Sequence, residues 1–308
     1  MAKQSVPVMK MAPSNAAGVV VASVPALPAS PVQATSDDHL IQLWLHERSR
    51  HTVRAYEADA RAFLSHAAKP LQAVTLGDVQ AYGGSLVHLA TATRARRLGA
   101  VKSLVAFGHR LGYLAFNVGA SIRLPAIKAT LAERIIGEGD VLALLALERQ
   151  PRDKALLSLL YRGGLRISEA VGLRWRDLAL RSDEGGQITV FGKGGKTRTV
   201  LLSAKTWSLL ETIRPNTAAS DAPVFLSREG NPLSPQQAHN VVKRAAARAG
   251  ISPALSAHWL RHAHASHSLD RGAKIHVVQA TLGHSNVATT SRYLHARPTE
   301  SSSLFLPE

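Results

Sequence analysis

Two segments of the sequence place cations next to glycines, an arrangement suited to binding a phosphate. Gly163 and Gly164 are followed by Arg166 at the start of a predicted helix, where a guanidinium would lie beside free backbone N–H groups. Residues 192–198, GKGGKTR, contain three glycines and three cations in seven residues. They do not match a nucleotide-binding phosphate loop, because the spacing differs and a strand follows instead of a helix. Taken alone, the two segments could also be an exposed arginine and an ordinary charged hairpin tip.

Histidines cluster further along, in residues 258–267, HWLRHAHASH. His258 and His262 are four residues apart and would share one face of a helix, which is a common spacing for metal ligands. A zinc-protease motif requires a glutamate after its first histidine, however, and a tryptophan stands there. The chain also has no cysteine, which excludes thiolate metal sites, thiol nucleophiles and disulfides. We therefore expect no metal, and we interpret His264 and His267 as core or surface residues.

A fourth segment, LGHSN at residues 282–286, precedes a tyrosine near the C-terminus. Tyr293 lies nine residues after His284. A phenol at this spacing is by itself most simply a packed aromatic side chain. Tyr293 becomes a candidate for chemistry only when it is considered together with the other three segments.

Charge indicates the class of partner. Among 308 residues, lysine and arginine number 37 and the acids 21, which gives a net charge of +16. The excess is spread along the chain, as expected for a protein that lies along a polyanion such as DNA. The alternative is a basic protein without such a partner. No apolar run approaches the about 20 residues of a membrane-spanning helix, so we expect a cytoplasmic, nucleoid-associated protein.

The elements that must position these residues fall into two modules. Residues 1–37 are rich in proline and lack any period, which predicts a disordered extension. Over residues 38–118, apolar side chains recur every three or four positions, which predicts four short helices. We expect Thr52 to cap the second helix, and Thr75 with Asp78 to cap the third.

The fourth of these helices is expected over residues 91–111 and is basic. Residues 119–130 have no clear period and are predicted to form a linker. We expect the cations of the fourth helix to contact DNA phosphates, although they could instead form a solvated basic face. They are Arg94, Arg96, Arg97 and Lys102.

In the second module, residues 131–308, the spacing of apolar residues is helical except for one stretch with the spacing of strands. Helices are predicted at 139–147, 153–161 and 167–172. Residues 187–191 and 197–202 are then β-branched or alternating, with glycines between them, which predicts a β-hairpin. Helical patterning resumes as far as Tyr293. The predicted fold is mainly α with a small antiparallel β-sheet.

Taken together, the four segments resemble the tyrosine recombinase, or phage integrase, family. The order and spacing of the polar residues carry the resemblance, and LGHSN matches the family's Leu-Gly-His motif. The pattern T-x3-Y-x2-D-x3-F of the family's N-terminal domain is also present, at Thr52, Tyr56, Asp59 and Phe63. Two departures are minor: Val118 replaces the usual proline after Asn117, and His264 stands where an aromatic or apolar residue is commoner. The residues that fill the family's catalytic positions are Arg166, Lys193, His258, Arg261, His284 and Tyr293.

The resemblance implies DNA strand exchange through a 3′-phosphotyrosyl intermediate, with no metal or other cofactor. Tyr293 would be the nucleophile, and Arg166 and Arg261 would hold the non-bridging phosphate oxygens. Lys193 would protonate the leaving 5′ oxygen. His258 and His284 would complete the pocket, as a proton-transfer partner and a phosphate hydrogen-bond donor in an order that the sequence leaves open. Glu169 matches an acid that supports the first arginine.

The resemblance also implies an architecture and partners. A SAM-like helical core-binding domain over 38–118 and a mixed α/β catalytic domain over 131–308 would form a C-shaped clamp on double-stranded DNA. Lys196 and Arg198 would add DNA contacts from the hairpin. Four subunits would assemble on paired sites, as a homo-tetramer or with a paralogous recombinase. The apolar segment 304–306 would dock on a neighbouring subunit, although it could instead fold back onto its own catalytic domain.

Three readings of the biological activity remain open from the sequence. The chain could integrate or excise a mobile element, or resolve chromosome dimers. It could be a DNA-binding member of the same fold that has lost catalysis, although all six catalytic positions are filled. A type IB topoisomerase would share the chemistry but not this compact two-domain layout.

Overall fold

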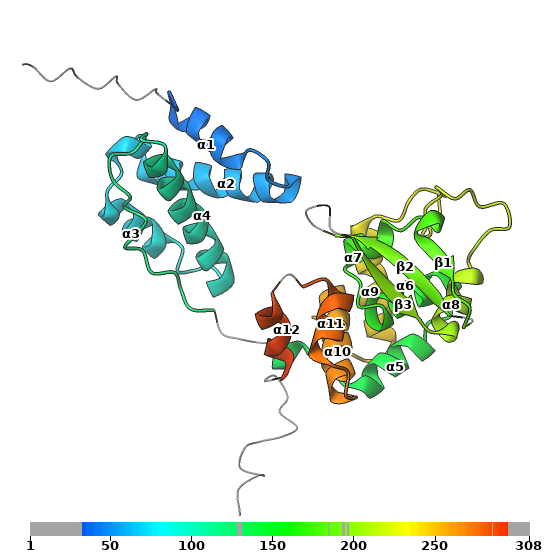
Figure 1. The fold of residues 1–308 in the computed structure, drawn as a ribbon. Coiled ribbons are helices and arrows are strands. Elements are labelled where there is room, and N and C mark those ends of the chain that lie inside the picture. Colours follow the sequence, from blue (N-terminus) through cyan, green and yellow to red (C-terminus); the bar gives the residue numbers. More distant parts are fainter. Residues whose placement is uncertain are drawn as a thin grey trace, which may run out of the picture. The chain divides into compact units, whose positions relative to one another are not determined.

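The computed structural model describes residues 33–127, 131–183, 185–192, 195, 197–284 and 286–294. The predicted extension up to residue 32, the end of the predicted linker, Lys193, Lys196 and the segment 304–306 lie outside the described residues. The chain divides into two compact units, Met1–Ile127 and Lys128–Glu308 (Figure 1). Within the described part, no helix has the length and apolar character needed to cross a membrane.

In its described residues, 33–127, the first unit contains four α-helices around a hydrophobic core of its own. Leu40, Phe63 and Leu104 are fully buried in that core, and the Trp44 ring stacks on Tyr56 with centroids 5.2 Å apart. The predicted helix over 91–111 is confirmed as α4, within one residue. The four helices are α1 (Asp37–Leu45), α2 (Arg50–Ala67), α3 (Leu76–Ser85) and α4 (Thr91–Arg110), with a short 3-10 turn at Leu71–Ala73.

Helix caps in this unit explain where the helices begin. The predicted capping box at the start of α3 is confirmed, because Thr75 and Asp78 each bond the backbone N–H of the other. The predicted cap at Thr52 was wrong. Ser49 precedes the helix and its hydroxyl accepts the Thr52 N–H, so that α2 already begins at Arg50. A serine three residues upstream also caps a free N–H group, and it lengthens the helix by almost one turn.

The second unit is mainly helical with one small sheet. The sheet is antiparallel with strand order β1-β2-β3, from β1 (Leu178–Leu180), β2 (Gly186–Phe191) and β3 (Thr197–Leu202). The predicted hairpin is confirmed, with Ile188 opposite Val200. Strand β1 was not predicted, because three residues are too few to show a period. The predicted fold class, mainly α with a small antiparallel sheet, is confirmed.

Helices of the second unit surround a large apolar core in which α6 is central. Leu156, Leu157, Leu159 and Leu160 of α6 are all fully buried, and α6 packs against α5, α7, α8, α9 and α10. The three helices predicted before the hairpin are confirmed within two residues. The helices are α5 (Glu138–Ala146), α6 (Pro151–Arg162), α7 (Ile167–Val171), α8 (Ala204–Glu211), α9 (Pro235–Arg248), α10 (Ala257–Asp270), α11 (Ile275–Leu282) and α12 (Val287–Leu294), with 3-10 turns at Ala132–Arg134 and Trp175–Asp177.

Two glycine turns bring distant parts of this unit together. Gly164, between α6 and α7, has a φ of +60°, and a Cβ there would lie 2.8 Å from His264 and 2.9 Å from Leu282. Gly283 ends α11 in the left-handed region, with a φ of 65°. Both positions therefore require glycine, and the first also allows α10 and α11 to approach the α6–α7 turn closely.

Candidate active site

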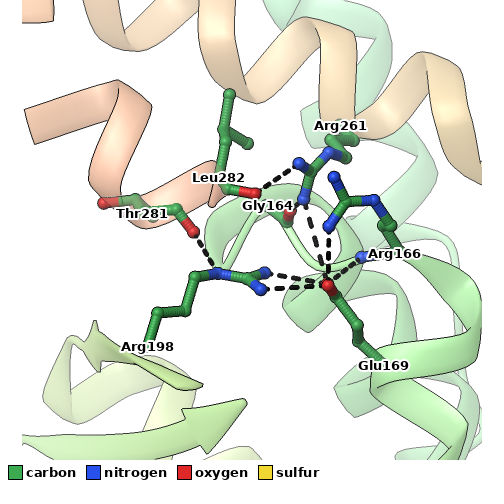
Figure 2. Close-up of polar contacts among 7 residues, drawn as sticks. All are labelled: Gly164, Arg166, Glu169, Arg198, Arg261, Thr281 and Leu282. Atoms are coloured by element: carbon green, nitrogen blue, oxygen red, sulfur yellow. Dashed lines mark hydrogen bonds and ion pairs between the residues drawn. The ribbon is translucent and has the colours of Figure 1, made fainter. Parts of the chain in front are cut away.

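The polar residues of the second unit converge where the α6–α7 turn meets α10, α11 and β3 (Figure 2). Arg166 is the N-cap residue of α7, and Arg261 lies in α10. Figure 2 shows their guanidinium groups side by side, with Glu169 below them. The structure therefore brings together two residues that are 95 positions apart in the sequence, both predicted to bind phosphate.

Arg261 is held rigidly by backbone carbonyls. Its side chain is 2% exposed, and its two terminal nitrogens donate hydrogen bonds to the carbonyl oxygens of Gly164 and Leu282. Burial, followed by the nearby Arg166 charge, lowers the pKa of Arg261 to about 10, so it stays a cation at neutral pH. A buried, fixed cation is well prepared to stabilise negative charge that develops on a phosphate.

Glu169 organises the arginines around it. It accepts hydrogen bonds from the Arg166 guanidinium at 2.7 Å and the Arg166 backbone N–H at 2.8 Å, and from two nitrogens of Arg198 at 2.9 and 2.8 Å. Burial opposes its ionisation, but the hydrogen bonds from Arg198 and Arg166 outweigh burial and lower the pKa of Glu169 to about 2. One carboxylate thus faces three guanidinium groups, and the cluster remains net positive.

Arg198 is largely buried and bonded within the protein, unlike an arginine that is exposed to contact DNA. Its Nε donates to the Thr281 carbonyl at 2.7 Å, its terminal nitrogens bond Glu169, and its side chain is only 12% exposed. These bonds tie β3 to α7 and to the end of α11. The DNA contact predicted for Arg198 stays a prediction, and the observed geometry favours a positioning role.

His258 and His284 are half-buried beside these cations. Burial and the charges of Arg261 and Arg166 lower the pKa of both, to about 4 for His284. The Nδ1 atom of His284 lies 2.9 Å from the hydroxyl of the fully buried Thr290. Both histidines are therefore neutral at pH 7, and each can present one N–H donor.

Tyr293 lies on α12 and is buried, with 6% of its surface exposed. Its phenol oxygen is 2.7 Å from Nδ1 of His262, which lies on α10 directly after Arg261. His262 was not among the residues predicted to take part in chemistry. Its position on the same helical face as His258, four residues on, is the signal that could have identified it.

The cations of α4 form local contacts within the first unit. Arg96 forms an ion pair with Asp59, and Arg97 lies 3.8 Å from the same carboxylate. Lys102 donates to the carbonyls of Ala120 and Ile122, at the start of the predicted linker. These bonds do not exclude the three cations from contact with DNA, and the DNA-binding role predicted for them and for Arg94 stays a prediction.

Asp59 itself is nearly buried, at 3% exposed. Burial raises its pKa above the usual range, and the charges of Arg96 and Arg97 only partly offset that effect. Because Asp59 belongs to the sequence pattern of the N-terminal domain, this ion pair gives that pattern a structural purpose: it joins α2 to α4.

A metal site finds no support in the described part of the chain, where no group of three or more histidines and acids is placed to hold an ion. The histidines and acids of the site are already engaged: Glu169 with arginines, His262 with Tyr293, and His284 with Thr290. The chemistry available here is that of a phenol, neutral imidazoles and fixed guanidinium groups.

Family models match both units. Residues 136–300 match the phage integrase family, and residues 37–112 match the phage integrase N-terminal SAM-like domain. The tyrosine recombinase XerC of Mycobacterium bovis is 34% identical over 275 residues, which covers 80% of this chain and 89% of that protein. XerC of Xylella fastidiosa is 31% identical over 258 residues, covering 80% of this chain and 86% of its own.

Solved structures agree with the fold. The XerH recombinase bound to its difH substrate matches with a TM-score of 0.67 at 20% identity, covering 89% of this chain and 84% of that one. A lambda integrase dimer bound to a core site matches with a TM-score of 0.68 at 17% identity, covering 86% and 95%. At these identities the likeness concerns the arrangement of elements.

Proposed function

Because this chain belongs to the phage integrase family of tyrosine recombinases, enzymes that cut and rejoin DNA at specific sites, we propose that the residues gathered around Arg261 perform that reaction. The observation that carries the proposal is the convergence, in one folded unit, of a buried phenol with fixed guanidinium groups. Tyr293 Oη lies 2.7 Å from Nδ1 of His262, which directly follows Arg261 on α10. A tyrosine nucleophile needs such a positive environment, because a free phenol has a pKa near 10.

In the proposed reaction, Tyr293 Oη attacks the phosphorus of a DNA phosphodiester. A 3′-phosphotyrosyl bond forms, and the bond from phosphorus to the 5′ oxygen breaks. Lys193 donates the proton that the leaving 5′ oxygen requires. Rejoining is the reverse reaction with a 5′ hydroxyl from the partner strand, so the bond energy is kept and no energy-rich cofactor is needed.

Arg166 and Arg261 bind the non-bridging oxygens of the same phosphate. Arg261 is locked by the Gly164 and Leu282 carbonyls, whereas Arg166 is 40% exposed and can meet the DNA directly. Guanidinium groups fixed before the substrate arrives stabilise the pentacoordinate transition state without reorganising. His258 and His284, both neutral, donate N–H bonds to the phosphate oxygens from the same pocket.

The substrate is a double-stranded DNA site, and its partner is a second copy of that site. Integration, excision and dimer resolution use the same cleavage and differ only in which sites are joined, so the residues above serve each of them. We propose that four subunits assemble on the paired sites, as a homo-tetramer or together with a paralogous recombinase. Such an enzyme would act in the cytoplasm, on the nucleoid.

Replacement of the nucleophile tests the proposal. We expect Tyr293→Phe to bind DNA as the unmodified protein does, because one phenol oxygen adds little ground-state affinity, but to form no covalent adduct on nicked substrates. Sequencing of DNA trapped by the unmodified protein would identify the site, and gel shift would measure binding. A covalent adduct formed by the phenylalanine variant would contradict the assignment of Tyr293.

A further inference from the structure

We propose that His262 is a catalytic residue, which accepts the phenol proton of Tyr293 through Nδ1 during strand cleavage and returns it during rejoining. The inference rests on the proposed function, since it assigns the proton that the nucleophile must lose. It gives to His262 the proton-transfer role that the resemblance implied for His258 or His284, and His262 is not one of the six catalytic positions matched in the sequence. The observation behind it is a direct contact with the reacting atom.

The contact has the geometry of a proton-transfer pair. His262 Nδ1 and Tyr293 Oη are 2.7 Å apart, within the range of a short O–H···N hydrogen bond. The two ring centroids are 5.6 Å apart and the ring planes are tilted by 49° to one another. A general base must lie within hydrogen-bond reach of the proton that it removes. His262 meets this condition before DNA is bound.

The surroundings keep the imidazole neutral and thus able to accept a proton. Burial, the neighbouring His258 and the positive charge of Arg134 and Arg261 lower the pKa of His262 to about 4. A phosphate held by Arg166 and Arg261 would bring a negative charge close by, which offsets those cations and makes protonation of His262 easier. The base therefore gains strength when the substrate is in place.

The other histidines of the site have different geometry. His284 Nδ1 faces the Thr290 hydroxyl. His258 lies against His262, with ring centroids 4.6 Å apart at 79°, an edge-to-face contact that holds the His262 ring in place. This arrangement favours His262 as the base and leaves His258 and His284 as donors to the phosphate.

The Tyr293 O–H bond breaks and its proton passes to His262 Nδ1 while the bond from Oη to phosphorus forms. The bond from phosphorus to the 5′ oxygen breaks, and that oxygen takes a proton from Lys193. In rejoining, protonated His262 returns the proton to the departing phenol oxygen. No electron donor or acceptor is required.

A more acidic nucleophile tests the step directly. His262→Asn keeps a hydrogen-bonding amide near the position of Nδ1 but removes the base, and should slow covalent trapping on a nicked site by about 100-fold or more. Difluorotyrosine at position 293 has a phenol that ionises more readily and should need the base less. In the His262→Asn variant, we expect difluorotyrosine at position 293 to increase the trapping rate about tenfold or more. In the enzyme that keeps His262, the same replacement should leave the trapping rate unchanged or reduce it.

His267→Asn is a matched control. His267 lies on the same helix and also contacts a tyrosine, with Nδ1 3.0 Å from the Tyr161 hydroxyl, but it is not part of the site. Its variant should show the same small difluorotyrosine effect as the unmodified enzyme. If His262→Asn does not fold, as judged by circular dichroism and DNA gel shift, His262→Gln replaces it.

Three outcomes separate the hypotheses. Rescue confined to the His262 variant supports a base. Full activity of His262→Asn, or a slow variant that difluorotyrosine does not rescue, would overturn the proposal, the second by showing that His262 only positions the phenol. Failure of the proposed function itself looks different: the unmodified protein would then form no adduct at Tyr293 on any DNA.

Discussion

Glu169 determines how the arginines of the site are arranged. It is 5% exposed and bonds Arg166 and Arg198 with both carboxylate oxygens. A buried carboxylate is costly unless its charge is paired, and the two guanidinium groups pair it fully. Loss of this one charge would leave Arg166 and Arg198 without the group that orients them.

The depressed pKa of Glu169 predicts a pH dependence of stability. Its pKa of about 2, against an ordinary value of 4.5, means that the unfolded chain takes up the proton first as the pH falls. The stabilisation, about 3 kcal/mol by linkage, should be complete above about pH 5 and lost progressively as the pH falls toward 2. Urea unfolding at pH 7 and pH 3.5 measures it.

Glu169→Gln is the control for this prediction. At pH 7 the Gln variant should be less stable than the unmodified protein, because the pairing charge is gone. The difference should shrink at pH 3.5, where the unmodified protein loses its advantage. An equal difference at both pH values would show that Glu169 stabilises the fold through packing rather than through its charge.

At the scale of elements, turns and inter-helix ion pairs position the site and its supporting domain. The α6–α7 turn supplies the Gly164 carbonyl that holds Arg261, and it leaves room for His264 and Leu282. In the first unit, the Asp59 carboxylate joins α2 to α4. Each feature can be tested by a substitution with a control.

Gly164→Ala should reduce both stability and cleavage. A left-handed residue other than glycine costs about 1 kcal/mol, and here the new Cβ would also press on His264 and Leu282 and displace the carbonyl that holds Arg261. Gly272→Ala is the matched control, since Gly272 has a φ of +83° but no atom within 4 Å of its Cβ position. Thermal unfolding measures the loss of stability in both variants. Covalent trapping should show a cleavage defect in Gly164→Ala alone.

The ion pair between α2 and α4 predicts a rescue. Arg96→Ala leaves the buried Asp59 carboxylate without its principal partner, which should cost about 1–3 kcal/mol of unfolding free energy. In the double variant with Asp59→Asn, the stranded charge is absent, so much of that loss should return. Chemical denaturation of the four proteins gives the coupling. Additive losses would instead indicate that Arg96 matters through other contacts, such as DNA phosphates.

At the scale of the whole molecule, two separately packed units carry a shared excess of positive charge. The core of the first unit and the cores of the second contain different residues, and the net charge is +16 over the chain. A protein of this kind binds a long polyanion through many weak phosphate contacts, each of which releases a counterion.

DNA affinity should therefore fall steeply with salt. If the protein makes about ten phosphate contacts, a plot of log affinity against log salt concentration should have a slope of about −9. Fluorescence anisotropy on a labelled site, between low and physiological salt, measures the slope. A nearly flat plot would contradict binding by both units and would point to a small, mainly apolar interface.

The sequence by itself was sufficient for the family and for most elements. The fixed order of Arg166, His258, Arg261, His284 and Tyr293 carried the resemblance, and local periodicity located the hairpin and α4. These features can be predicted from the sequence because helix and strand periods, caps and turn glycines depend on residues that are close together in the chain. Strand β1 could not be predicted because a three-residue strand shows no period. The cap of α2 could not be predicted because two residues, Ser49 and Thr52, are both suited to capping.

The tertiary structure decided which polar groups meet. His262 and Tyr293 are 31 residues apart and touch because α12 packs on α10. Arg198 of β3 bonds Glu169 of α7, 29 residues away, and its Nε also bonds the Thr281 carbonyl at the end of α11, which packs against β3. No local period encodes such contacts, since they depend on how whole elements bury their apolar faces together. Because of that packing, His262 lies beside the proposed nucleophile Tyr293. In the same way Arg198 pairs with the Glu169 carboxylate, and Asp59 lies next to Arg96 and Arg97.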